Sequence, residues 1–212
     1  MEAYDSDQVV DGVGKTSFTL SISMASLFLG VHIGMMLLPA IPKMRPPSRA
    51  MEYTVSVISV LVYFATFPAY FRLPASFRHQ ATAALLFSFP GTLTRYVLSI
   101  FLNPRLKLLP IGTLVANEFG TSLLATFHVI QGLKHPVSPG ACAILQGLDD
   151  GYCGCLTTVS TFASELRALG IRRGLLYGTI SIGLGQIFMV LILGSAVWTG
   201  RASSQISCTP IL

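Results

Sequence analysis

Charge is the scarcest feature of this sequence. Only 11% of the 212 residues are charged, whereas 52% are hydrophobic, and the mean hydropathy is +0.66. A soluble domain carries about 25% charged residues, so the deficit excludes an ordinary soluble core and indicates a lipid environment. The net charge of +5 is scattered over short segments between apolar runs, a pattern typical of membrane orientation and not of nucleic-acid binding. We predict an all-α, polytopic membrane protein with no nucleic-acid partner.

Several functional signals are also lacking. The acidic N-terminal stretch 1–11 excludes the charged-then-apolar pattern of a cleavable signal peptide. Gly14-Lys15-Thr16 lacks the earlier glycine of a phosphate-binding loop, since that position is Val9. The four histidines form no metal-binding cluster, and three of the four cysteines lie in or beside apolar runs, which makes a disulfide framework unlikely. No catalytic constellation is present, so we predict that the protein is not an enzyme.

Six apolar runs reach the roughly 20 residues that a membrane span needs. They cover residues 18–40, 53–71, 81–102, 109–132, 140–169 and 175–198. The fifth run is too long for one plain helix, and Asp149, Asp150 and a glycine-bearing stretch lie in its middle. We therefore predict about six transmembrane helices, one of them broken in mid-membrane so that freed backbone groups line a site.

Short polar connections, including the strongly basic segment 167–173, separate these runs. An external N-terminus would place more Lys and Arg residues on the inner side than on the outer side, as the positive-inside rule requires. The inner eight are Lys43, Arg45, Arg49, Arg105, Lys107, Arg167, Arg172 and Arg173, against an outer five of Lys15, Arg72, Arg78, Lys134 and Arg201. The count favours both termini outside.

Two motifs place polar residues inside predicted spans. Arg95, in Pro-Gly-Thr-Leu-Thr-Arg-Tyr, either faces a polar partner or extends its guanidinium to the membrane interface. Asn117 and Glu118 follow in the next span, where a lone asparagine is more often a contact between helices than a ligand. Ala116 and Gly120, four residues apart, would let another helix approach closely.

Two further motifs combine glycine with hydroxyl groups. Residues 151–162 carry glycines and the run Thr-Thr-x-Ser-Thr, which favours an ion path, although hydroxyls that bond back to carbonyls at a kink would also explain it. On the last span, Tyr177, Ser181 and Gly185 lie on one helical stripe. Helix packing explains the glycines of this span better than it explains the Tyr–Ser pair.

The four motifs, in this order on four consecutive spans, resemble the CrcB/Fluc fluoride channel family, and in particular its eukaryotic exporter branch, FEX. The resemblance covers residues 81–198, and Gly-x-x-Thr-Thr-x-Ser-Thr-Phe-x-x-Glu at 154–165 is its most specific part. It implies a passive, fluoride-selective channel of the plasma membrane that exports fluoride and gives fluoride resistance. Family members are dimers of four-span units in opposite orientations, and eukaryotic members fuse two such repeats through a linker span.

The resemblance also implies roles for individual residues. Backbone carbonyls of Gly154 and Thr157 would hold a central structural sodium ion shared between two repeats. Asn117 would lie at the fluoride entrance, and Phe162 would offer its positive ring edge to the anion. Hydroxyl groups along the path would come from Ser160, Thr161, Tyr177 and Ser181. The remaining motif residues, expected to be structural, are Arg95, Gly112, Thr113 and Glu165.

On this resemblance, residues 1–45 hold the last span of a first repeat and 46–79 a linker helix. Residues 80–201 form a four-span repeat and 202–212 a tail. The chain then looks like the carboxy-terminal part of a longer protein and needs a second inverted repeat or a homodimer partner. Val159 stands where the family usually has a phenylalanine, which suggests two unequal pores. Two alternatives remain: a proton-coupled transporter that uses Glu118 or Asp150, and a non-conducting fragment.

Overall fold

The computed structural model describes residues 6–37, 47–72, 83–106, 108–133 and 137–203, and within these ranges its named elements are all helical. The elements are α1 (Ser6–Leu37), α2 (Arg49–Arg72), α4 (Ala83–Leu102), η2 (Asn103–Arg105), α5 (Ile111–Gln131), α6 (Pro139–Gly147), η3 (Leu148–Cys153), α7 (Gly154–Leu156), α8 (Val159–Met189), η4 (Val190–Gly194) and α9 (Ser195–Trp198). The predicted all-α class is confirmed.

Four segments of the described chain are long and apolar enough to cross a membrane: Ser17–Leu37, Arg49–Arg72, Ala83–Arg105 and Pro139–Trp198. The last, of 60 residues, contains the fifth and sixth predicted spans. The 21-residue helix α5 is not among them, because polar residues such as Asn117, Glu118 and His128 lower its hydropathy. A helix of this composition needs polar or protein neighbours on one side.

The chain divides into two compact units. Unit 1 combines Met1–Pro46 with Val159–Leu175, and unit 2 combines Pro47–Thr158 with Leu176–Leu212. This division concerns compactness and not repeats, so the predicted repeat boundaries stay a prediction.

Within unit 1, Gly170 interrupts α8. Its backbone angles, φ 74° and ψ 173°, lie in a region that only glycine adopts readily, so α8 consists of two helices that meet at this residue. We predicted that the basic segment 167–173 is a connection between two spans. This prediction is wrong in extent, because the residues of the segment other than Gly170 are helical. Arg167 stacks on the ring of Phe28 in α1, with the guanidinium carbon 5.2 Å from the ring centroid.

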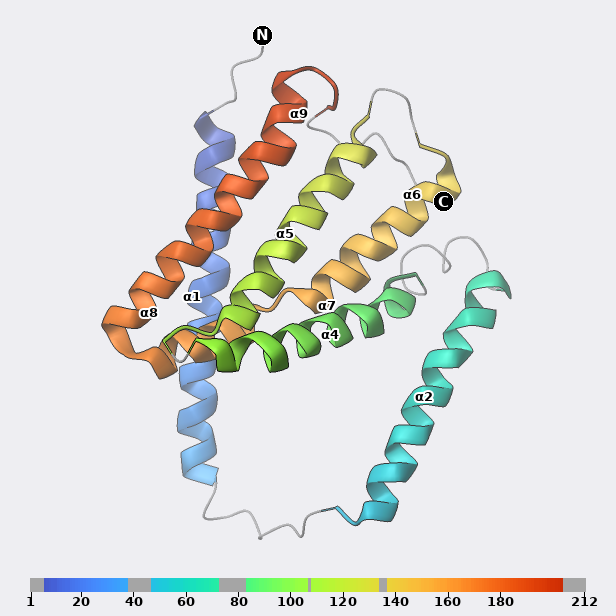
Figure 1. Cartoon of the computed structure of the whole chain (residues 1–212), viewed down its shortest axis with the longest axis vertical. Coiled ribbons are helices and arrows are strands. Elements are labelled where there is room, and N and C mark those ends of the chain that lie inside the picture. Colours follow the sequence, from blue (N-terminus) through green and yellow to red (C-terminus); the bar gives the residue numbers. More distant parts are fainter. Residues whose placement is uncertain (1–5, 38–46, 73–82, 107, 134–136, 204–212) are drawn as a thin grey trace. The chain divides into compact units, whose positions relative to one another are not determined.

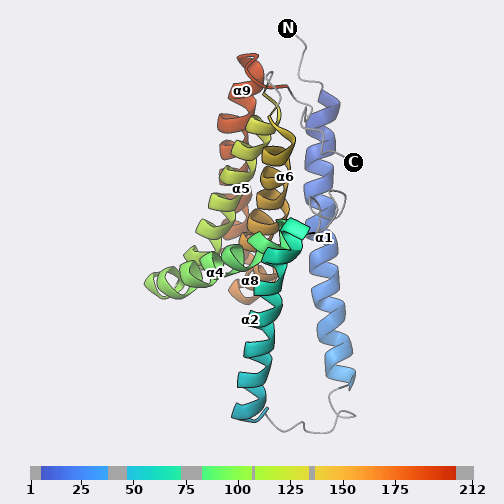
Figure 2. The ribbon, with the colours of Figure 1, turned by 90° about the vertical axis from the view of Figure 1, so that its right-hand side faces the viewer.

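Within unit 2, α5 is the central helix. It packs against α4, α6, η3, α7 and η4, and the side it buries is made of small or polar residues: Gly112, Thr113, Ala116, Gly120, Ala125 and Gln131. Figures 1 and 2 show α5 beside α6, with α4 running crosswise to both. Small side chains let these backbones approach closely, as is usual where apolar burial alone does not drive packing.

The crosswise helix α4 touches the segment α6–η3 through glycines. A side chain at Gly91 would collide with the backbone carbonyl of Tyr152, and one at Gly151 would collide with the carbonyl of Ala84. The hydroxyls of Thr94 and Tyr152 lie 3.1 Å apart across the same contact. The glycine in the first motif is therefore explained by packing.

Proline 90 accounts for a contact between α2 and α4. Proline has no N–H, so Pro90 cannot donate to the carbonyl of Leu86 one turn earlier. The hydroxyl of Tyr63 on α2 donates to that carbonyl instead, at 3.1 Å. A span can keep an internal proline when a neighbouring side chain satisfies the freed carbonyl in this way.

One expectation about cysteine is wrong. Cys153 and Cys155 are free, but Cys142 near the start of α6 is disulfide-bonded. Its position within an apolar run gave no indication of this pairing.

Candidate ion site at the broken helix

The fifth predicted span is broken where the glycine and threonine run lies. Helix α7 ends at Leu156, Thr157 adopts extended backbone angles of φ −77° and ψ 154°, and α8 begins at Val159. Before the break, both the N–H and the hydroxyl of Thr157 donate to the carbonyl of Cys153, each at 2.9 Å. The prediction of an interrupted helix is confirmed, and the interruption itself is limited to Thr157 and Thr158.

Asn117 on α5 holds the broken segment. The buried Thr158 donates its backbone N–H to the side-chain oxygen of Asn117 at 2.8 Å, and the Asn117 amide donates to the Thr158 carbonyl at 3.4 Å. A side chain at Gly120, one turn along α5, would collide with the methyl group of Thr157. Asn117 and Gly120 thus fix the break against α5, which is the contact role that we considered for a lone asparagine.

The break redirects backbone hydrogen bonds. In a continuous helix, the N–H of Thr158 would donate to the carbonyl of Gly154, but here it donates to Asn117. Gly154 is exposed and Thr157 is half-buried. Backbone oxygen atoms suit a hard cation. The described residues contain no group of three or more His, Cys, Asp or Glu side chains that could hold a metal ion.

After the break, the first turns of α8 carry the path residues that we predicted at this end of the helix, followed by Glu165. Ser160 and Thr161 are exposed, Phe162 is 7% exposed, and Glu165 is half-buried. The first N–H groups of a helix have no partner inside that helix and carry partial positive charge. This end of α8 is therefore suited to an anion.

The stripe on the second half of α8 lies against α5 within unit 2. Tyr177 is completely buried and Ser181 is 7% exposed. The Ser181 hydroxyl donates to Oε1 of Glu118 at 3.4 Å, and an added Cβ at Gly185 would lie 3.6 Å from Oε2 of Glu118. The structure brings Ser181 to Glu118, a residue that the sequence placed only in the transporter alternative.

Two of the four residues expected to be structural occupy buried, packed positions. Gly112 and Thr113 are buried, and the Gly112 N–H donates to the side chain of Asn103 at 2.7 Å, which caps the first turn of α5. Arg95 is half-buried, with no acidic partner among the residues described.

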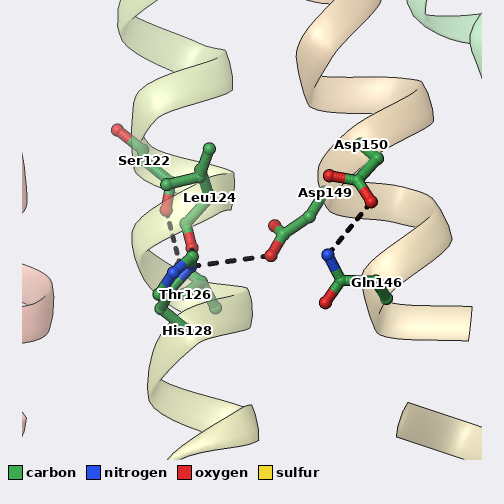
Figure 3. Close-up of polar contacts among 7 residues, drawn as sticks. All are labelled: Ser122, Leu124, Thr126, His128, Gln146, Asp149 and Asp150. Atoms are coloured by element: carbon green, nitrogen blue, oxygen red, sulfur yellow. Dashed lines mark hydrogen bonds and ion pairs between the residues drawn. The ribbon is translucent and has the colours of Figure 1, made fainter. Parts of the chain in front are cut away.

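Sequence reasoning missed a polar pair between α5 and η3. Figure 3 shows His128 and Asp149 directed toward each other, with 3.5 Å between Nδ1 and Oδ2. His128 Nδ1 also lies 3.2 Å from the Leu124 carbonyl, and Gln146 donates to Asp150 at 3.0 Å. The sequence offered only two acidic residues in a long apolar run, and no local pattern links them to a histidine on another helix.

Comparisons with known proteins agree with the motif positions. The model of the family described as "CrcB-like protein, Camphor Resistance (CrcB)" matches residues 82–195. The chain is 36% identical over 211 residues to fluoride export protein 1 of Neurospora crassa, covering 91% of this chain and 39% of that protein. It is 46% identical over 125 residues to fluoride export protein 1 of Candida albicans, covering 56% of this chain and 32% of that protein.

A bacterial relative matches about half of the chain. Fluoride-specific ion channel FluC 1 of Streptococcus pneumoniae is 36% identical over 107 residues, which cover 49% of this chain and 89% of that protein. The chain thus spans most of a bacterial protein but less than half of these fungal relatives. No solved structure gives a significant match.

Proposed function

Because the chain belongs to the CrcB-like family, we propose that it is one repeat of a passive, fluoride-selective channel that exports fluoride and confers fluoride resistance. One observation supports this most strongly: Asn117 holds the helix break at Thr157 and Thr158. The relatives are named as fluoride export proteins and as a fluoride-specific ion channel, and these names describe transport. The chain therefore acts in transport and not in catalysis.

The ion path follows from the chemistry of fluoride. The ion is small and strongly hydrated, so hydroxyl donors and aromatic ring edges must replace its water as it enters. Two buried residues, Tyr177 and Ser181, supply hydroxyls on one helical stripe. The family resemblance implies that Ser160, Thr161 and the ring edge of Phe162 also belong to the path, and that Asn117 belongs to its entrance.

The family resemblance also implies a structural sodium ion. Backbone carbonyls of Gly154 and Thr157 would hold it, and the bound ion would supply positive charge. Two carbonyls are too few for a full ligand shell of a hard cation. The missing ligands would come from a second repeat in the inverted orientation, or from a second copy of this chain, and the assembly would lie in the plasma membrane.

One observation favours a second candidate, a proton-coupled fluoride transporter. Oε2 of Glu118 is buried and has no hydrogen-bond partner among the described residues. An ionisable group of this kind inside a span is a candidate proton carrier. The two candidates differ in whether transport moves net charge.

Flux from liposomes containing the purified chain distinguishes these candidates. A channel releases fluoride only when a potassium ionophore compensates the charge, whereas proton-coupled transport proceeds without the ionophore. We expect ionophore-dependent release and a much slower release of chloride. Release that is independent of the ionophore and driven by a pH gradient would contradict the channel. Absence of release, together with a monomeric particle in detergent, would support a non-conducting fragment.

A substitution at the start of α8 tests the proposed path. We expect Phe162→Ile to abolish fluoride release while the amount of folded protein holds, because an aliphatic side chain has no positive ring edge. Phe89→Ile, at an exposed site on α4, is the matched control and should retain release. Normal release by Phe162→Ile would remove Phe162 from the path.

A further inference from the structure

We propose that Glu118 controls, through its protonation, whether Ser181 can donate a hydrogen bond to an ion on the path. This inference rests on the proposed fluoride path, which includes Ser181. Glu118 is then a positioning residue: it acts on the ion through the Ser181 hydroxyl. Asn117 beside it is bonded to the broken segment and keeps this part of α5 in place.

The contact between the two side chains is weak. Ser181 is 7% exposed, and its hydroxyl donates to Oε1 of Glu118 at 3.4 Å, which is long for an O–H···O bond. Oε2 is buried, lies against the Gly185 backbone and has no hydrogen-bond partner among the described residues. Ser181 can exchange this acceptor for another at little cost.

The two protonation states of Glu118 reverse this hydrogen bond. An ionised carboxylate only accepts hydrogen bonds, so it holds the Ser181 hydrogen and leaves oxygen lone pairs toward an approaching anion. A protonated carboxyl group can donate to the Ser181 oxygen. The Ser181 hydrogen is then free to bond to fluoride, and the negative charge beside the path is gone.

Four other titratable groups, on α5 and η3, make contacts with partners other than Glu118. Asp149 pairs with His128, Asp150 accepts from Gln146, and the Tyr152 hydroxyl contacts Thr94. On α5, and on the described elements of unit 2 packed against it, the other titratable groups are His128 on α5, Arg95 and Tyr96 on α4, Arg105 on η2, Asp149, Asp150, Tyr152 and Cys153 on η3, Cys155 on α7, and Tyr177 on α8. The hydrogen bond from Ser181 is the contact that links Glu118 to the proposed path.

Fluoride release from liposomes containing the full chain tests the inference between about pH 5 and about pH 8, where perturbed carboxyl groups titrate. Release from protein-free liposomes is subtracted, because uncharged hydrogen fluoride crosses lipid. We expect the wild-type rate to rise as pH falls. We expect Glu118→Gln to be about fivefold faster than wild type at about pH 8, equivalent to one net hydrogen bond of about 1 kcal/mol. Its rate should not depend on pH.

Two comparisons separate this role from a structural one. Ser181→Ala should be slow at every pH, and the double variant Glu118→Gln/Ser181→Ala should be equally slow, because Glu118 acts through Ser181. His128→Gln should keep the wild-type pH profile. If Glu118→Gln does not fold, Glu118→Met removes both the charge and the carboxyl acceptor at similar volume and should be fast and independent of pH.

Three results would overturn the inference. The first is a wild-type rate and pH profile in Glu118→Gln, with fluoride release otherwise normal, which leaves the proposed channel intact. The second is a fast double variant, which would show that Glu118 does not act through Ser181. The third is a wild-type chain that releases no fluoride at any pH, which overturns the proposed function as well.

Discussion

Replacing Asn117 by alanine tests the contact that holds the broken helix. The substitution removes the acceptor of the buried Thr158 N–H at 2.8 Å and the weaker donor to the Thr158 carbonyl at 3.4 Å. Loss of a partner for a buried backbone group costs about 1–3 kcal/mol. Because the longer bond adds little, we expect a total loss of stability of about 2–3 kcal/mol.

Thermal unfolding in detergent measures this loss. For a chain of this size, about 2–3 kcal/mol corresponds to a decrease in Tm of about 4–12 °C. The matched control is Ser122→Ala on the same helix, whose hydroxyl donates only to the Glu118 carbonyl one turn earlier, at 2.8 Å. We expect the control to change Tm by about 2 °C or less, and Asn117→Asp, which keeps the acceptor, to lie in between. An unchanged Tm for Asn117→Ala would refute the role of Asn117 in holding the break.

Two further predictions concern glycines and use the same thermal assay. Gly91→Ala should lower stability by about 1–3 kcal/mol, because its Cβ would collide with a backbone carbonyl of η3. The control Gly183→Ala, which has no atom within 4 Å of the added Cβ, should be neutral or slightly stabilising. Equal effects of the two substitutions would argue against the α4–η3 contact. Gly170→Ala should lower stability by about 1–2 kcal/mol, because φ is 74°, and no loss would mean that α8 does not bend there.

The sequence was sufficient to predict the membrane class and the site of the break. The first followed from the scarcity of charge, and the second from glycine and hydroxyl residues between Gly154 and Phe162. Both signals are local and need no knowledge of packing. The prediction that Gly120 allows close approach was also confirmed, because small residues at a spacing of four have one common use in spans.

Contacts between distant elements could not be predicted. Asn117 bonds to Thr158 and Tyr63 bonds to Leu86, and in each case the partner lies on a distant segment of the chain and the bond is to a backbone atom. Backbone partners leave no side-chain pattern in a sequence. The helical extent around Gly170 was missed for a different reason: basic residues normally indicate a loop between spans, but they are also good helix formers.

Growth of a fluoride-hypersensitive yeast strain tests the proposed function most directly. The strain would express this chain alone or fused behind a complete, inverted first repeat, with protein at the plasma membrane measured in both cases. We predict growth on fluoride for the fused form, because the proposed path and the proposed sodium site would each need two repeats. Growth with the chain alone would show that two copies can also supply them. Failure of the fused form to grow on fluoride, at normal abundance in the plasma membrane, would contradict the assignment of this chain as a fluoride-channel repeat.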